Sequence, residues 1–176
     1  SQTLGKVLIS GGGRCNVTHA CFDPAQLITF YPRGGVELRG AFTRFQPADT
    51  VKWFESHGVK LKTEADHRMF PVTDSSETIA DCLREAAKNA GVKVHVGTAL
   101  LKVEKNPKGG FKLEVRKDAE VLPLQTKKII IATGSDSKTR EIVRSLGHSI
   151  EEPVPSLFTF NIKDKRIDGL AGVSVE

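Results

Sequence analysis

Residues 6–18 read KVLISGGGRCNVT, and this stretch decides the fold prediction. Residues 6–10 are largely apolar and predict a short strand that runs directly into three glycines. Glycine tolerates positive φ and lets the backbone approach a ligand, so successive amides here can form an anion-binding nest. Arg14 adds a fork of donors, and the Asn16 amide can donate and accept at once. Both a ligand cradle and a plain tight turn fit this pattern.

The glycine run differs from the two common phosphate-binding motifs. No Gly-Lys-Ser/Thr follows it, as a Walker A loop requires, and it is not the dinucleotide fingerprint G-x-G-x-x-G. Cys15 beside Arg14 invites a nucleophile hypothesis, because a neighbouring cation lowers a thiol pKa. No base is identifiable nearby, and the sequence favours a small buried thiol at this position.

Helical periodicity recurs three times along the rest of the chain. Residues 47–57 begin with a proline in the first turn and stop at Gly58. Residues 75–90 carry one apolar stripe, start at a predicted capping box of Asp74 and Glu77, and stop at Gly91. A third helix is predicted over residues 137–146.

Strand patterns fill the space between the last two helices. Residues 92–96 alternate apolar and polar, and residues 99–105 and 111–116 predict a hairpin joined through a Pro/Gly-rich turn. Residues 121–125 form a weaker strand. Residues 127–134 (KKIIIATG) contain the apolar run 129–132 and end at a glycine turn, which is typical of a strand buried on both faces. The pattern predicts a mixed α/β fold with α+β features and an antiparallel hairpin layer.

Composition argues against several functional classes. The chain has 176 residues and a net charge of +5, but its basic residues are interspersed with acids, as on a solvated surface. The three cysteines include no C-x-x-C pair and the five histidines are dispersed, so neither a disulfide framework nor a metal site is predicted. Without a secretory signal or a membrane-length apolar run, we expect a cytoplasmic or organelle-matrix protein that is not secreted.

Four ordered blocks resemble the BaiN/YhiN-type FAD/NAD(P)-binding flavoprotein oxidoreductases. They are residues 6–18, the segment RMFPVT at 68–73, the segment IIIATG at 129–134, and LGHSI with PVPSL between 146 and 157. The resemblance implies a partial glutathione-reductase-type Rossmann FAD domain over residues 1–150 that lacks its first βαβ unit. Residues 151–176 would then be a linker and the first strand of a second domain.

The resemblance also implies cofactor-binding roles for eleven residues. The first group would line the flavin or its pyrophosphate: Gly11, Gly12, Gly13, Arg14, Cys15 and Asn16. Ala99 and Leu100 would face the adenine, although a plain hairpin also explains them. Ala132, Thr133 and Gly134 would pack beside the cofactor, although a strand-ending turn also explains them. Catalytic residues stay unassigned; His148 is the best titratable candidate, and a helix C-cap role fits it equally well.

Two departures from the family pattern limit the expected activity. The sequence contains neither G-x-G-x-x-G nor the ribose-binding acid that should follow it, and residues 134–138 replace the family's Tyr-Pro-x-Thr-Gly-Ser loop. We therefore expect an internal or truncated fragment of an FAD-dependent oxidoreductase that binds FAD weakly and is inactive alone. Its expected partners are flavin, NADH or NADPH as electron donor, and an unknown small-molecule substrate, without nucleic acid or membrane.

Two other functional classes compete with this interpretation. The first is a non-enzymatic nucleotide- or anion-binding module that uses residues 11–14. The second is a basic nucleic-acid binder, which ranks last because aromatic and basic residues are not interleaved.

Overall fold

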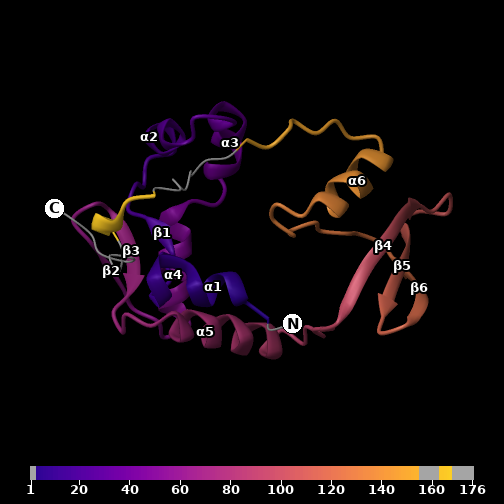
Figure 1. The fold of residues 1–176 in the computed structure, drawn as a ribbon, viewed down its shortest axis with the longest axis horizontal. Coiled ribbons are helices and arrows are strands. Elements are labelled where there is room, and N and C mark those ends of the chain that lie inside the picture. The colour runs from indigo at the N-terminus through magenta and orange to yellow at the C-terminus, as the bar shows by residue number, and fades with distance from the viewer. Residues whose placement is uncertain (1–2, 155–162, 168–176) are drawn as a thin grey trace. The chain divides into compact units, whose positions relative to one another are not determined.

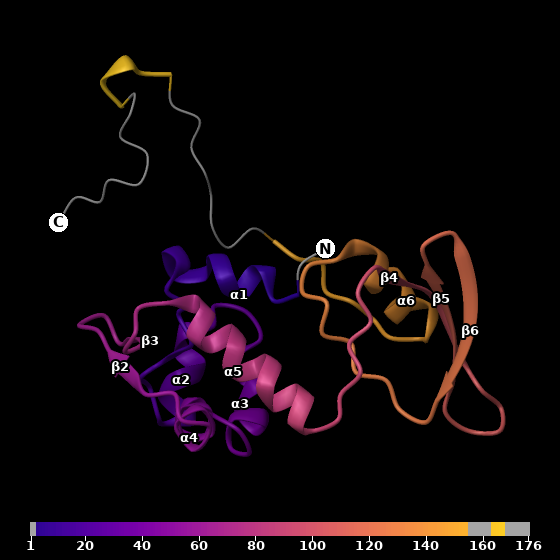
Figure 2. The ribbon, with the colours of Figure 1, turned by 90° about the horizontal axis from the view of Figure 1, so that it is seen from below.

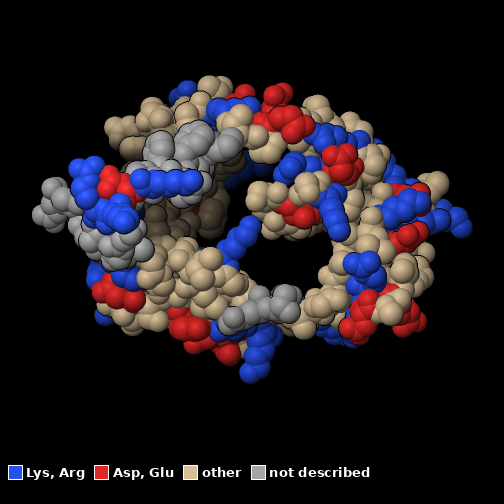
Figure 3. All heavy atoms as spheres, in the orientation of Figure 1, with Lys and Arg blue, Asp and Glu red and all other residues tan. Residues whose placement is uncertain are grey.

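The computed structural model describes residues 3–154 and 163–167. The chain divides into two compact units, Ser1–Gly97 and Thr98–Glu176, and each is considered by itself (Figure 1). Helices and antiparallel sheets make up both units, so the predicted mixed α/β class is confirmed. Acidic and basic side chains are interspersed over the face shown in Figure 3, as the sequence predicted.

The first unit holds five α-helices and a small sheet among its described residues. In chain order they are α1 (Gly5–Ile9), the 3-10 turn η1 (Ser10–Gly13), β1 (Thr18–His19), α2 (Pro24–Leu27), η2 (Ile28–Phe30), α3 (Gly35–Phe42), α4 (Pro47–Ser56), β2 (Leu61–Thr63), β3 (Arg68–Pro71) and α5 (Ser76–Asn89). The sheet has the order β1-β3-β2 and is antiparallel throughout. Thr18 pairs with Met69, so the sheet attaches the end of the glycine-rich segment to β3.

The core of the first unit lies between this sheet and the long helices. Cys15, Phe54, Val59 and Ile79 form its buried cluster, and Phe70 of the central strand is fully buried. Helix α1 runs along α5, as Figure 2 shows, and the Ser76 hydroxyl donates a hydrogen bond to the Leu8 carbonyl at 2.8 Å. This contact fixes the residues just before the glycine loop.

The predicted helices at 47–57 and 75–90 are confirmed as α4 and α5, with one correction. Pro47 occupies the first turn of α4, and Gly58 follows that helix with φ +81°. The prediction that Asp74 caps α5 was wrong: Ser75 is the N-cap residue, and no side chain caps the helix. The Asp74 carboxylate pairs instead with Lys62 and Arg14, because two cations compete with the helix N-terminus for it.

The second unit is built on a three-stranded antiparallel sheet. Its strands β4 (Thr98–Lys105), β5 (Phe111–Lys117) and β6 (Glu120–Thr126) pair in chain order, and α6 (Ser137–Ser145) packs on β4. A short 3-10 turn, η3, covers Lys165–Ile167. The predicted hairpin, the weaker third strand and the helix are therefore confirmed. Gly110 is essential to the first turn, since a Cβ there would lie 2.3 Å from the Thr126 carbonyl oxygen.

Three other predicted strands are not strands. Residues 6–10 form most of α1 and the start of η1, with the Leu8 amide bonded to the Leu4 carbonyl at 3.0 Å. Residues 92–96 and 128–134 have no regular structure. A strand needs a neighbouring strand to satisfy its backbone amides and carbonyls, and the described residues pair no strand with these segments. Val92, Val94 and Val96 are exposed, and so is Ile130, at 90%, whereas Ile129 and Ile131 are half-buried.

The remaining predictions concern the C-terminal part of the chain. The strand predicted at residues 157–162 lies outside the described residues, and the domain boundary at residue 150 stays a prediction. Within the described ranges, no helix is both long and apolar enough to cross a membrane.

Candidate functional site

The glycine-rich loop adopts a left-handed backbone. Gly11, Gly12 and Gly13 have φ of +57°, +67° and +84°, and Cys15 has φ +63°. The loop is closed by a hydrogen bond from the Cys15 amide to the Ser10 carbonyl at 2.9 Å. Residues with a Cβ are strained in this region, so the run of glycines has a direct backbone cause.

The three glycines differ in what surrounds them. A Cβ on Gly11 would lie 2.8 Å from both the Asn16 amide nitrogen and the Phe70 ring, so packing within the protein already requires a glycine. Of the residues that the structure describes, none has an atom within 4 Å of a Cβ placed on Gly12 or Gly13, chain neighbours aside. The backbone at these two positions is therefore open to an approaching ligand, which fits the expected cofactor loop.

Arg14, by contrast, is already paired. Its Nη1 lies 2.6 Å from Glu64 Oε1 and 3.6 Å from Asp74 Oδ1, and its guanidinium carbon lies 4.0 Å from the Phe70 ring centroid. The hydrogen bond with Glu64 raises the pKa of Arg14 above its ordinary value. The carboxylates of Glu64 and Asp74 thus compensate the positive charge of Arg14, which the sequence pattern assigns to a phosphate or carboxylate ligand.

The carboxylate of Asp74 links this arrangement to the sheet. Lys62 of β2 donates to Asp74 Oδ2 at 2.5 Å, and this hydrogen bond, followed by the charges of Lys62 and Arg14, lowers the pKa of Asp74. The Arg14–Glu64 and Lys62–Asp74 pairs connect the loop, β2 and the turn that precedes the N-cap residue of α5. The loop is therefore held by contacts far apart in the chain.

Cys15 and Asn16 face different surroundings. Cys15 is 6% exposed and belongs to the core cluster with Phe54, Val59 and Ile79, which matches the buried-thiol interpretation. Asn16 is exposed and lines a cavity of about 350 Å³ within the first unit. The remaining lining comes from β1, the α2–η2 segment, the end of α3 and the start of α4: Val17, Thr18, His19, Leu27, Tyr31, Phe42, Phe45, Gln46, Pro47 and Thr50.

Sequence reasoning missed this cavity, although a compositional signal was present. Five of the eleven aromatic residues of the chain fall between positions 22 and 45: Phe22, Phe30, Tyr31, Phe42 and Phe45. Four of these side chains are exposed, at 41–60%. A concentration of exposed aromatic residues is unusual for a solvated surface and is typical of binding sites.

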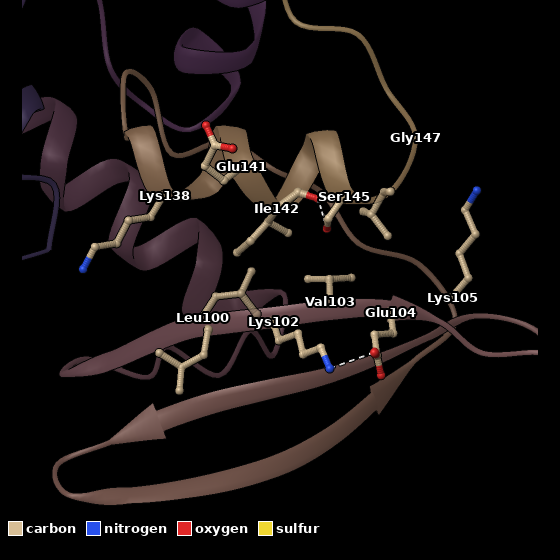
Figure 4. Close-up of a pocket in the computed structure, with 12 residues that line it drawn as sticks. Leu100, Lys102, Val103, Glu104, Lys105, Lys138, Glu141, Ile142, Ser145 and Gly147 are labelled. Carbon is tan, nitrogen blue, oxygen red and sulfur yellow. Dashed lines mark hydrogen bonds and ion pairs between the residues drawn. The ribbon is translucent and has the colours of Figure 1, made fainter.

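The adenine-facing residues of the prediction lie on β4 in the second unit. Leu100 lines a cavity of about 780 Å³ between β4 and α6, where Val103 and Ile142 point toward one another (Figure 4). Ala99 pairs with Arg116 of β5 and does not line this cavity. Lys102 turns to Glu104, with 2.8 Å between Nζ and Oε1.

The third predicted group is not held by a strand. Ala132, Thr133 and Gly134 are exposed and lie in the irregular segment between β6 and α6. The structure therefore brings residues 11–16 together in the first unit and residues 99–100 together on β4. The roles of all eleven residues stay predictions.

The remaining candidates give no metal or acid–base centre. The described ranges contain no group of three or more His, Cys, Asp or Glu side chains arranged to hold a metal ion. His148 is exposed just after α6, and its amide donates to the Val143 carbonyl at 3.4 Å, as a residue beyond a helix end does. Among the free cysteines, burial raises the pKa of Cys82.

Comparison with known proteins places the chain among flavoproteins. It is 24% identical over 179 residues to the 3-dehydro-bile acid delta(4,6)-reductase of Clostridium scindens. This alignment covers 97% of this chain and 42% of the reductase. It is 28% and 26% identical to the ribosomal RNA dihydrouridine synthases of Escherichia coli and Haemophilus influenzae. These alignments cover 84% and 97% of this chain, and 34% and 44% of the synthases. The chain thus spans less than half the length of these relatives.

The family comparison extends over the whole sequence. The model of the HI0933-like protein Rossmann domain matches residues 1–176, which include all four blocks quoted above. The chain therefore belongs to the HI0933-like Rossmann-domain family of BaiN/YhiN-like flavoproteins.

Proposed function

We propose that this chain is part of an FAD-dependent reductase and that residues 11–16 form its flavin-proximal loop. The observation that carries this proposal is the open left-handed backbone at Gly12 and Gly13. In a family of flavoproteins, a loop of this kind serves a ligand that approaches the main chain closely.

The residues of the first unit fit such a cofactor in a specific way. Gly12 and Gly13 would offer backbone contacts, and Asn16 would donate to and accept from a polar ring edge. Arg14 would hold the loop in position through Glu64 instead of binding phosphate. Bound FAD supplies the hydride chemistry, and the chain's own residues bind and orient.

We infer a substrate class from the names of the relatives. Their names describe a reduction of a delta(4,6) bile acid that carries a 3-dehydro group, and a synthesis of dihydrouridine from uridine in ribosomal RNA. Both reactions reduce a carbon–carbon double bond in a ring that also bears a carbonyl group. We extend this reaction class to the protein that contains this chain, with NADH or NADPH as electron donor.

The 176 residues by themselves should bind FAD weakly and turn over no substrate. Their sequence holds no G-x-G-x-x-G, and the predicted contacts at Ala132, Thr133 and Gly134 lie on an irregular segment. Each directional contact that is missing costs on the order of 1 kcal/mol, and about four of them lower affinity by several powers of ten.

The alternative of an anion-binding module loses support from the geometry of Arg14. A module that binds phosphate through residues 11–14 would use the Arg14 guanidinium together with the backbone amides, whereas Glu64 and Asp74 already compensate this cation. Displacing them would leave two carboxylates beside the incoming anion, which is unfavourable.

A titration of the chain with FAD, followed by flavin fluorescence quenching, tests the proposal. We expect a dissociation constant well above one micromolar that rises further in Gly13→Ala. Gly58→Ala is the matched control, because Gly58 has nearly the same φ (+81° against +84°) and the same open surroundings but follows α4. Submicromolar binding would refute the weak-binding claim, and equal effects of the two substitutions would refute the role of the loop.

A further inference from the structure

We propose that the cavity beside Asn16 binds an uncharged, planar, single-ring heterocycle that carries adjacent N–H and C=O groups, as uracil does. The cavity has a volume of about 350 Å³ and is lined entirely by residues of the first unit. Its role as the site of the substrate ring rests on the proposed function. Ring binding itself does not, and it can be measured without flavin.

The walls of the cavity are suited to a flat ring. Tyr31, Phe42 and Phe45 contribute aromatic faces, and the Tyr31 and Phe42 rings already pair at 5.6 Å between centroids. The exposed fractions of Tyr31 and Phe45 are 41% and 57%, so both side chains retain surface on which a ligand can stack. Stacking on aromatic side chains is the usual way in which proteins hold heterocyclic bases.

The charge of the lining selects against ions. Not one Lys, Arg, Asp or Glu lines the cavity, although these residues make up 27% of the chain. Arg14 is the charged residue of the segment SGGGRCN, and it is paired with Glu64. His19 is the only side chain that can become cationic among the lining residues that the structure describes, so a carboxylate or phosphate would meet at most one imidazole there, whereas a neutral ring has no charge to remove from water.

The polar lining residues match an edge of alternating donors and acceptors. Asn16 and Gln46 carry carboxamides, which donate and accept at once, and Thr18 carries a hydroxyl that can do either. The Thr50 hydroxyl donates to the Gln46 carbonyl at 3.5 Å and can accept from a ligand. A ring with neighbouring N–H and C=O groups pairs with a carboxamide through two parallel hydrogen bonds. A purely apolar ring would leave these groups without partners, which is costly in a cavity.

The position of Asn16 connects the cavity to the predicted cofactor loop. Asn16 lines the cavity and also ends the segment SGGGRCN, next to the loop whose open face is formed by Gly12 and Gly13. A ring held in the cavity would therefore contact Asn16, which the proposed function also assigns to the flavin-proximal loop. This adjacency distinguishes it from the larger cavity on β4, which belongs to the second unit.

The test uses the full 176-residue chain without FAD and uridine as the probe, followed by chemical-shift changes in amide NMR spectra. We expect saturable shifts at Asn16, Thr18 and Thr50, and about tenfold weaker binding in Phe45→Ala, which is the range for loss of one stacking partner. Phe22→Ala is the matched control, since Phe22 is also an exposed phenylalanine of the first unit but does not line the cavity.

A second comparison isolates the planarity of the ring. Dihydrouridine keeps the N–H and C=O edge of uridine but has a puckered ring, so we expect it to bind several-fold more weakly. Equal affinity for both probes, equal effects of Phe45→Ala and Phe22→Ala, or shifts confined to other residues would each overturn the proposal.

Two further probes distinguish the molecules from which such a ring could come. Riboflavin carries the same N–H and C=O edge on a three-ring system. Riboflavin binding that is tighter than uridine binding, and that is weakened equally by Phe45→Ala, would reassign the cavity to the cofactor and overturn the substrate role. A short oligouridylate that binds more tightly than uridine would support the proposal with a ring from RNA, and equal affinity would support it with a free nucleoside. Failure of FAD to bind would leave these results unaffected.

Discussion

The sheet of residues 98–126 and the apolar segment of residues 128–134 are neighbours in sequence and opposites in structure. The three strands of the sheet pair in chain order, and Val103 and Val115 are 3% and 9% exposed. The apolar segment forms no strand, and Ile130 is 90% exposed. The difference teaches that strand-like sequence becomes a strand only where a partner is available.

The cost of finding a partner explains the contrast. Each strand of the sheet is joined to the next by a short turn, so little loop entropy opposes pairing. Parallel strands need a crossover of a dozen or more residues, and a continuous apolar run such as residues 129–132 is typical of parallel sheets. Residues 6–10 show the same behaviour, because without a partner strand they satisfy their amides within α1.

The largest expected effect comes from placing a charge in each region. Val103→Asp should lower the free energy of unfolding of the second unit by more than about 3 kcal/mol, since it buries a carboxylate between β4 and α6. Ile130→Asp should change it by less than about 0.5 kcal/mol, because that side chain is already in water. Urea unfolding followed by circular dichroism measures both. A comparable loss in the two variants would show that the apolar segment is packed.

Hydrogen exchange provides the next test and needs no substitution. Amides of β5 pair on both sides with β4 and β6, whereas amides of residues 128–133 are in no ladder. We expect exchange in β5 to be slower by at least about a hundredfold after correction for intrinsic rates, since it requires opening of the sheet. Similar protection in both segments would break the contrast.

The same distinction separates what the sequence predicts from what it does not. Helices α4, α5 and α6 were predicted because their apolar stripes and their proline or glycine ends are local signals. The hairpin of β4 and β5 was predicted for the same reason. The irregular structure of residues 128–134 could not be predicted, because a side-chain pattern does not say whether a partner strand exists.

The candidate site divides in the same way. The left-handed glycines at positions 11–13 follow from their residue type, which tolerates positive φ. The pairing of Arg14 with Glu64 and the cavity between β1 and α4 join residues tens of positions apart, and neither has a local signature. The wrong assignment of Asp74 as a helix cap has this cause too, since Lys62 and Arg14 are the partners it finds in the folded chain.

The non-local ion pair between Arg14 and Glu64 should contribute measurably to the stability of the first unit. Glu64→Gln removes the charge that pairs with Arg14, so we expect it to lower the melting temperature of the first unit. This decrease should be smaller than the one that Val103→Asp causes in the second unit. Glu77→Gln is the control, because Glu77 is 60% exposed in its pair with Arg84 on α5. Differential scanning calorimetry with both variants measures the effect. Equal melting temperatures would mean that the glycine loop does not depend on this pair.

The smallest expected effect is a pH dependence that reports on the same loop. The hydrogen bond from Lys62, with the charges of Lys62 and Arg14, lowers the pKa of Asp74 in the folded state. A lowered folded pKa stabilises the protein above the ordinary aspartate value of about 3.9, and this contribution is lost as the pH falls through the folded pKa. The melting temperature of the first unit should therefore fall on acidification below about pH 4, and less steeply in Asp74→Asn. Lys62→Met should reduce the slope as well, because it removes the first cause of the shift. An unchanged slope in both variants would place the acid sensitivity elsewhere, outside the contacts that join the loop to β2.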